Sequence, residues 1–71
     1  MQSTAWEYLN LARRWAAGRN FRHEVKRVGR DMHIYVSLEP GDEGTHIATV
    51  AYDWEGDRES VAWLVERPPG F

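Results

Sequence analysis

Cysteine is absent from this 71-residue chain, and three kinds of chemistry are absent with it. Disulfide bonds, cysteine-ligated zinc sites and thiol catalysis all need that side chain. Long apolar runs are missing as well, since no stretch approaches the roughly 20 apolar residues that a membrane-spanning helix requires. The first residues show no basic segment followed by an apolar one, so we expect no signal peptide and predict a cytoplasmic protein that makes no membrane contact.

Catalytic motifs are equally scarce. The sequence contains no phosphate-binding loop, no dinucleotide-binding G-x-G-x-x-G and no G-x-S-x-G nucleophile motif. No two of the histidines His23, His33 and His46 have the short spacing typical of zinc ligands. Strand alternation places His23 and His46 on the core face of a sheet and His33 on the other face. We therefore predict a protein that is not an enzyme and that needs no cofactor and no metal.

The chain is short enough to form only one small domain, residues 1–71. A domain of this size buries only about 60% of the surface that its unfolded chain exposes, so its stability needs a further source. Nine aromatic residues, four of them tryptophan, can supply this stability by packing. Association with a partner is the alternative source. Residues 67–71 contain two adjacent prolines that cannot continue a strand, and they predict an extended C-terminal tail.

The spacing of apolar residues changes from a helical period to a period of two after Gly18. We predict the α+β class, with one N-terminal helix packed on a four-stranded antiparallel meander sheet as a two-layer sandwich. Thr4 and Glu7 have the spacing of a capping box, and Gly18 suits the left-handed end of the helix. The predicted helix spans residues 5–17, and the predicted strands span 20–28, 31–38, 45–54 and 59–66.

Two tight hairpins set the predicted register of the sheet. A two-residue loop at residues 29–30 places Val25 opposite Ile34. A second hairpin, turning around a later glycine, places Val50 opposite Trp63. In this register the apolar residues of all four strands share one face, as a correct register requires. The predicted core face of the sheet consists of Phe21, Val25, Met32, Ile34, Val36, Leu38, Ala48, Val50, Tyr52, Val61, Trp63 and Val65.

The opposite face of the predicted sheet has no second helix to cover it. It contains Tyr35, Ile47 and Leu64, although an exposed sheet face is usually polar. Exposed apolar patches often mark interaction sites, and Arg22 and Lys26 on the first strand would orient a partner. We predict that these five residues contact another protein chain, a host protein or a second copy, so homodimerisation stays open. The alternative, that the threonine, alanine and tyrosine residues of this face are simply good strand formers, also stays open.

Charge is divided unevenly along the chain, with seven bases and two acids in residues 1–30 but two bases and nine acids in residues 31–71. One interpretation is that the two halves meet in the fold and their charges cancel. Another is that the chain is a compact, phage-encoded inhibitor whose acidic surface imitates phosphates with its carboxylates and occupies a nucleic-acid-handling enzyme of a host. The residues of this second candidate surface lie in polar turns: Asp42, Glu43, Asp53, Glu55 and Asp57.

The sequence leaves two candidate functions, which belong to different classes. The first is a small protein-binding module, an inhibitor or adaptor that covers a surface of its partner. The second is a small nucleic-acid-binding domain that uses the basic first strand and one aromatic ring. The net charge of −2 and the pI of about 5.8 argue against the second, so we expect nucleic-acid binding to be weak or absent. The residues of this alternative are Arg19, Arg22, Lys26, Arg30 and Tyr35.

Overall fold

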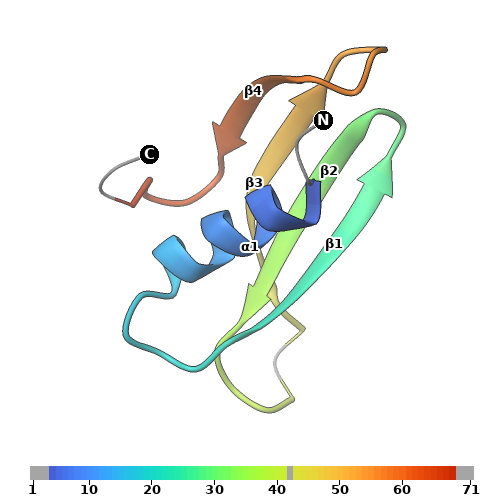
Figure 1. Ribbon diagram of the computed structural model, residues 1–71. Helices are drawn as coiled ribbons and strands as arrows, with labels where there is room; N and C mark the ends of the chain where they lie inside the picture. The colour runs from blue at the N-terminus through green and yellow to red at the C-terminus, as the bar shows by residue number, and fades with distance from the viewer. Residues whose placement is uncertain (1–3, 42, 69–71) are drawn as a thin grey trace.

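The structure, a computed structural model, describes residues 4–41 and 43–68. One helix is followed by four strands, and each strand pairs antiparallel with the next in the order β1-β2-β3-β4 (Figure 1). This arrangement confirms the predicted α+β fold, an N-terminal helix with a meander sheet. The elements are α1 (Thr4–Trp15), β1 (Arg22–Val28), β2 (Asp31–Ser37), β3 (Thr45–Tyr52) and β4 (Arg58–Trp63).

The helix α1 forms because its apolar residues recur at helical spacing and share one side. Tyr8, Leu11 and Ala12 lie on this side and are buried. The helix ends at Trp15 rather than at residue 17, and Gly18 then adopts a φ of +78°, a conformation that favours glycine. The side chain of Thr4 is outside the described part of the chain, so the capping box stays a prediction.

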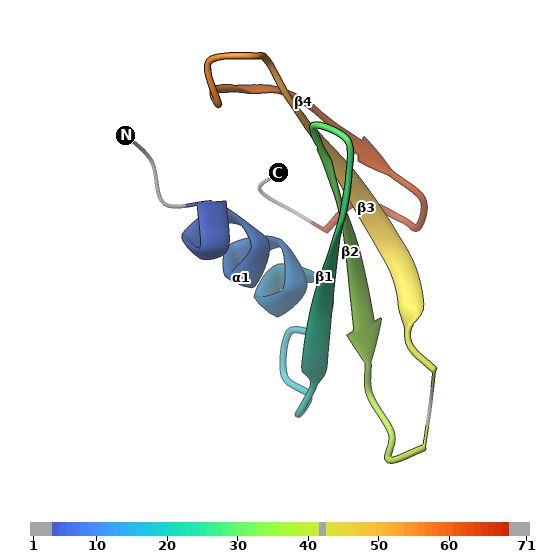
Figure 2. The same ribbon diagram turned by 90° about the vertical axis from the view of Figure 1, so that its right-hand side faces the viewer.

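The helix lies on one face of the sheet, and no helix of the described residues covers the other face (Figure 2). We call this uncovered face the outer face. The core between α1 and the sheet contains the apolar residues predicted for it, either buried or half-buried. The buried members of this core are Tyr8, Leu11, Ala12, Ala16, Ile34, Val36, Ile47, Ala48, Val50 and Tyr52.

Residues 69–71 of the predicted tail are outside the described residues, whereas Arg67 is exposed and Pro68 is buried. Neither of these two residues belongs to a strand. Among the described residues, no helix has the length and apolar character needed to cross a membrane.

The strands β1 and β2 pair in the predicted register. Val25 lies opposite Ile34, and Val28 lies opposite Asp31, which closes a two-residue turn. The first residue of this turn is Gly29, with a φ of +64°, as the turn type requires. Within β1 only Val25 is half-buried and every other residue is exposed, so β1 is the solvated edge of the sheet.

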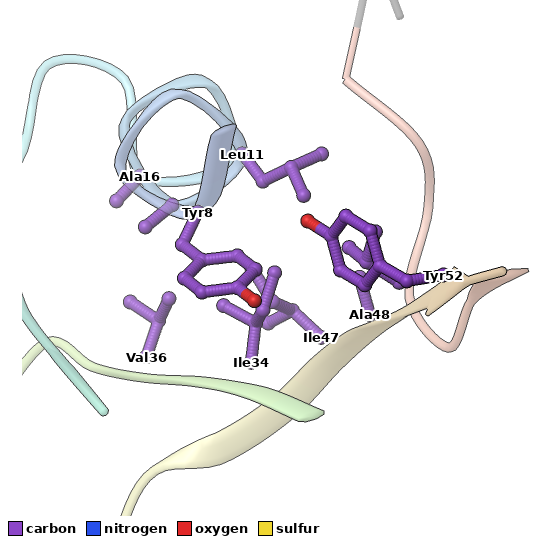
Figure 3. Packing of buried hydrophobic residues seen from close by; sticks show 10 residues of the cluster. Tyr8, Leu11, Ala16, Ile34, Val36, Ile47, Ala48 and Tyr52 are labelled. Atoms are coloured by element: carbon purple, nitrogen blue, oxygen red, sulfur yellow. The ribbon is translucent and has the colours of Figure 1, made fainter. Parts of the chain in front are cut away.

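One extra residue in β3 changes which side chains face the core. Ile34 pairs with Ala48 but Tyr35 pairs with His46, so Ile47 has no partner of its own on β2. At such a β-bulge two successive side chains share a face, and the alternation before the bulge is inverted. Ile47 is accordingly 0% exposed and lies beside Ile34 in the core (Figure 3). The predictions that Ile47 lies on the outer face and His46 on the core face are therefore wrong.

The turn between β3 and β4 is organised by Asp53. Its Oδ1 accepts hydrogen bonds from the backbone amides of Glu55 and Asp57, both at 2.9 Å. The Asp53 amide donates to the carbonyl of Asp57 at 2.8 Å, and Gly56 has a φ of +90°. Aspartate commonly closes turns in this way, because its carboxylate can reach amides a few residues further on.

Beyond this turn, β4 pairs with residues 48–51 of β3 two residues away from the predicted register, and a second register shift lies between Ala51 and Tyr52. Val50 lies opposite Val61, and Trp63, predicted there, pairs instead with Ala48. A shift of two residues leaves each side chain on its predicted face, because strand alternation has a period of two. Val61 and Trp63 therefore still pack against the core, as predicted.

A hydrogen bond links α1 to β3. The Tyr52 hydroxyl donates to Glu7 Oε2 at 2.8 Å, and the Tyr52 ring meets the Tyr8 ring edge-on, with their centroids 6.5 Å apart. Burial, and after it the hydrogen bond to Glu7, raises the pKa of Tyr52 well above its ordinary value. Arg58 on β4 lies 3.9 Å from Glu7 Oε1, a half-exposed ion pair that contributes little on its own.

Replacement of Ile47 by alanine should destabilise the protein strongly, because it opens a cavity in the core. We expect the free energy of unfolding to fall by about 2–5 kcal/mol, and by about 0.5–1.5 kcal/mol for Ile47→Val. Leu64→Ala changes a 56% exposed side chain and should cost less than about 0.5 kcal/mol. Urea denaturation followed by circular dichroism measures all three variants. Equal losses of unfolding free energy for Ile47→Ala and Leu64→Ala would contradict the β-bulge.

The Tyr52 hydroxyl should make stability depend on alkaline pH. Its pKa is higher in the folded chain than in the unfolded chain, where it is about 10, so the folded state keeps this proton longer. The Tyr52 hydroxyl makes its full contribution to the free energy of unfolding below about pH 10, and this contribution is lost as the pH rises above that value. There the free energy of unfolding should fall more steeply in the wild type than in Tyr52→Phe, by about 1.4 kcal/mol per pH unit. Parallel pH profiles of the urea midpoints would rule this out.

Candidate functional site

The β-bulge assembles three aromatic rings on the outer face. His33 and Tyr35 come from β2, two residues apart and therefore on one face, and His46 comes from β3. The His46 ring stacks on both, with centroids 4.7 Å from each and interplanar angles of 23° and 26°. The His46 ring therefore contacts both other rings. The three residues thus form a continuous stack, which we call the ring column.

Hydrogen bonds fix the central ring of the column. His46 Nε2 lies 3.2 Å from the carbonyl oxygen of Ala48 and 3.1 Å from Thr49 Oγ1. A carbonyl oxygen only accepts hydrogen bonds, so Nε2 holds the hydrogen and donates it. The imidazole is therefore held by its hydrogen bonds and by contact with the two other rings. A side chain that is already fixed loses little conformational entropy when a partner binds, and this favours a role in an interface.

Lys26 extends the ring column on its β1 side. Its Nζ lies 5.0 Å from the centroid of the Tyr35 ring, within the range of a cation–π interaction. Because His46 covers one face of Tyr35, the ammonium group takes the other. Arg22 and Glu24 occupy the same face of β1 as Lys26, at alternate positions, and are exposed. The two basic residues predicted to bind a partner thus lie beside the column, with an acid between them.

Leu64 is the exposed apolar residue of the predicted contact surface. It directly follows β4, its amide donates to the carbonyl of Ile47 at 2.9 Å, and alternation places its side chain on the outer face. Its side chain is 56% exposed. Four of the five predicted contact residues, including Tyr35, Arg22 and Lys26, therefore belong to this face, whereas Ile47 is buried and cannot contact a partner. The binding role of the four stays a prediction.

The acidic residues do not form one surface. Glu43 lies in the turn between β2 and β3, at the opposite end of the sheet from Asp53, Glu55 and Asp57 (Figure 1). Asp42 is outside the described residues. Oxygens of the other three carboxylates lie within 4.8 Å of one another. The turn itself explains this proximity, because Asp53 Oδ1 is engaged with two amides of the same turn.

The residues of the nucleic-acid hypothesis are also dispersed. Arg19 precedes β1 and Arg30 follows it, so they lie near opposite ends of this strand (Figure 1). Single-stranded bases bind by stacking on open aromatic faces. Both faces of Tyr35 are already in contact with neighbours, one with His46 and the other with Lys26. The geometry therefore provides no open stacking platform at the position where the sequence suggested one.

Two features, the ring column and one exposed tryptophan, were not predicted from the sequence. The column was missed because uninterrupted alternation placed His46 in the core. The available signal was the apolar pair Ile47 and Ala48, which cannot both face the core in a regular strand. Trp54, in the turn organised by Asp53, is 76% exposed, the highest value among the exposed large apolar residues described. Its place in an acidic turn was a signal for a surface role, since exposed tryptophan is enriched in protein interfaces.

Fold and site together define a small α+β domain with an uncovered, partly aromatic sheet face. No family model matches the chain, and neither curated proteins nor solved structures give a significant match. A fold alone does not determine a function. The function is therefore inferred from the residues of the outer face and of the turns.

The ring column predicts a magnetic-resonance signature at His46. Protons stacked over neighbouring aromatic rings are shielded, so the His46 ring protons should resonate upfield of those in an unstructured histidine. Tyr35→Leu removes one stacked ring and should shift these signals downfield. Trp54→Leu, which removes a ring outside the column, should leave them unchanged. Proton–carbon correlation spectra of folded variants measure the shifts, and unchanged His46 signals in Tyr35→Leu would refute the column.

Proposed function

We propose that the protein is a small, non-enzymatic protein-binding module whose contact surface is the outer face. The observation that supports this most directly is the rigid ring column on a sheet face that no described helix covers. Aromatic side chains held in place by neighbours contribute contact area at low entropic cost, which is typical of interface anchors. Leu64 adds exposed apolar area, and Arg22 and Lys26 add positive charge on the β1 side.

A protein partner suits this surface better than a nucleic acid does. A partner protein can pack against ring edges, the Tyr35 hydroxyl and the Leu64 side chain without needing a free ring face. Nucleic-acid binding relies on many phosphate contacts, and the net charge of −2 opposes it. Only Arg22 and Lys26 of the predicted basic residues share the face with Tyr35, which is a small electrostatic footprint.

The inhibitor or adaptor role and a cytoplasmic location belong to the same proposal. Covering a surface of a host protein needs a rigid exposed face and no catalytic group. The acidic turn at residues 53–57, which contains the exposed Trp54, is the second candidate surface, because carboxylates can imitate phosphates. Glu43 does not extend this surface, since it lies at the other end of the sheet.

A matched pair of substitutions separates the two surfaces. Leu64→Lys and Trp54→Lys each replace an exposed apolar side chain by lysine, the first on the outer face and the second in the acidic turn. A protein captured from the source cell by the wild type should be captured at least about tenfold more weakly by Leu64→Lys. Trp54→Lys should capture it as the wild type does. Quantitative mass spectrometry measures the capture, with circular dichroism to verify that both variants fold.

Two results would replace this proposal by another. Loss of capture with Trp54→Lys but not with Leu64→Lys would move the contact to the acidic turn. A salt-sensitive, sub-micromolar affinity for single-stranded DNA or RNA, lost in Arg22→Ala and Lys26→Ala, would replace the protein partner by a nucleic acid.

A further inference from the structure

The strand β1 forms one edge of the sheet, and no described strand pairs with its free side (Figure 1). Its pairing with β2 runs through all seven residues, Arg22–Val28, without a register shift. Six of these residues are exposed and only Val25 is half-buried. A regular edge strand of this kind is a template for pairing with another strand.

The hairpin geometry shows which backbone groups point to the free edge. In a two-residue hairpin the residues that close the turn, here Val28 and Asp31, exchange hydrogen bonds with each other. The direction of N–H and C=O groups alternates along a strand. The backbone groups of His23, Val25 and Arg27 therefore point away from β2 and toward the free edge.

The side chains of β1 on the outer face alternate in charge in the order Arg22, Glu24, Lys26. In an antiparallel pair of two copies with a twofold axis at Val25, Glu24 of each copy lies opposite Lys26 of the other. All seven residues of β1 then pair, and two pairs of opposite charge form. An axis at Glu24 or at Lys26 instead places two like charges opposite each other, which is destabilising.

From this complementarity we infer that a second copy of the chain binds along β1, joining the two four-stranded sheets edge to edge. The Val25 residues of the two copies pair with each other at the axis. On either side of the axis, His23 of one copy pairs with Arg27 of the other. Each of these residue pairs exchanges two backbone hydrogen bonds. The outer face stays uncovered in this dimer, so the inference goes beyond the proposed function and does not depend on it.

Charge reversal at the two complementary positions tests the pairing and its register together. Glu24→Lys places lysine opposite Lys26 twice, and Lys26→Glu places glutamate opposite Glu24 twice. Each single variant should raise the dimer dissociation constant at least about tenfold, whereas the double variant restores both pairs and should dimerise as the wild type does. Glu59→Lys on β4, the same reversal on the other edge strand, is the matched control and should dimerise normally. Sedimentation equilibrium measures association, and circular dichroism verifies folding.

Amide hydrogen exchange locates the interface without relying on charge. The amides of His23, Val25 and Arg27 pair only in the dimer, so they should exchange at least about tenfold more slowly in the wild type than in monomeric Glu24→Lys. The amides of Glu24 and Lys26 pair with β2 in both states and should change little.

Several outcomes would overturn the edge-to-edge dimer. These are a wild type that remains monomeric at about millimolar concentration, single variants that dimerise like the wild type, and a folded double variant that stays monomeric. A dimer in which the three edge amides exchange as fast as in the monomer would also exclude it. Dimerisation that is lost with Leu64→Lys but not with the charge reversals would assign the contact to the outer face.

Discussion

A single extra residue in β3 determines the composition of both faces of the sheet. Without the bulge, regular alternation would expose the Ile47 side chain and bury the His46 imidazole. Full burial of an isoleucine contributes about 1.5–3 kcal/mol, and an imidazole buried without hydrogen bonds costs a comparable amount. The bulge disrupts the β2–β3 ladder locally but places both side chains favourably. The same inversion brings His46 into contact with His33 and Tyr35.

The parts of the fold that follow local rules were predictable from the sequence. The helix and the first hairpin each depend on a glycine that the backbone requires, Gly18 or Gly29, and on apolar residues of regular spacing. The second hairpin was placed two residues away from its true register, because the carboxylate of Asp53 closes the turn. Side-chain hydrogen bonds of this kind are weakly marked in a sequence. The link from Tyr52 to Glu7 was missed for a similar reason, since it joins residues distant in the chain.

In the candidate site, too, the residues that follow regular pairing were predictable and the others were not. Tyr35, Arg22 and Lys26 lie on the outer face as predicted, because β1 and β2 pair without interruption through the positions that hold them. Ile47 was misplaced because it is the bulge residue, where the assumption of regular alternation fails. The acidic residues were grouped by composition alone. In an antiparallel meander, however, successive turns lie at opposite ends of the sheet, so Glu43 is separated from the turn at residues 53–57.

The meander also determines where the unequal charges of the two halves meet. The β1–β2 turn and the β3–β4 turn lie at the same end of the sheet (Figure 1). Arg27 and Arg30 accordingly line one shallow depression together with Asp53 and Trp54. Positive side chains that line the same depression as Asp53 weaken the negative potential of the acidic turn. An imitation of phosphates by this turn is correspondingly weakened. The outer face, which holds four of the five predicted contact residues together with the ring column, is the better-supported candidate surface for a partner.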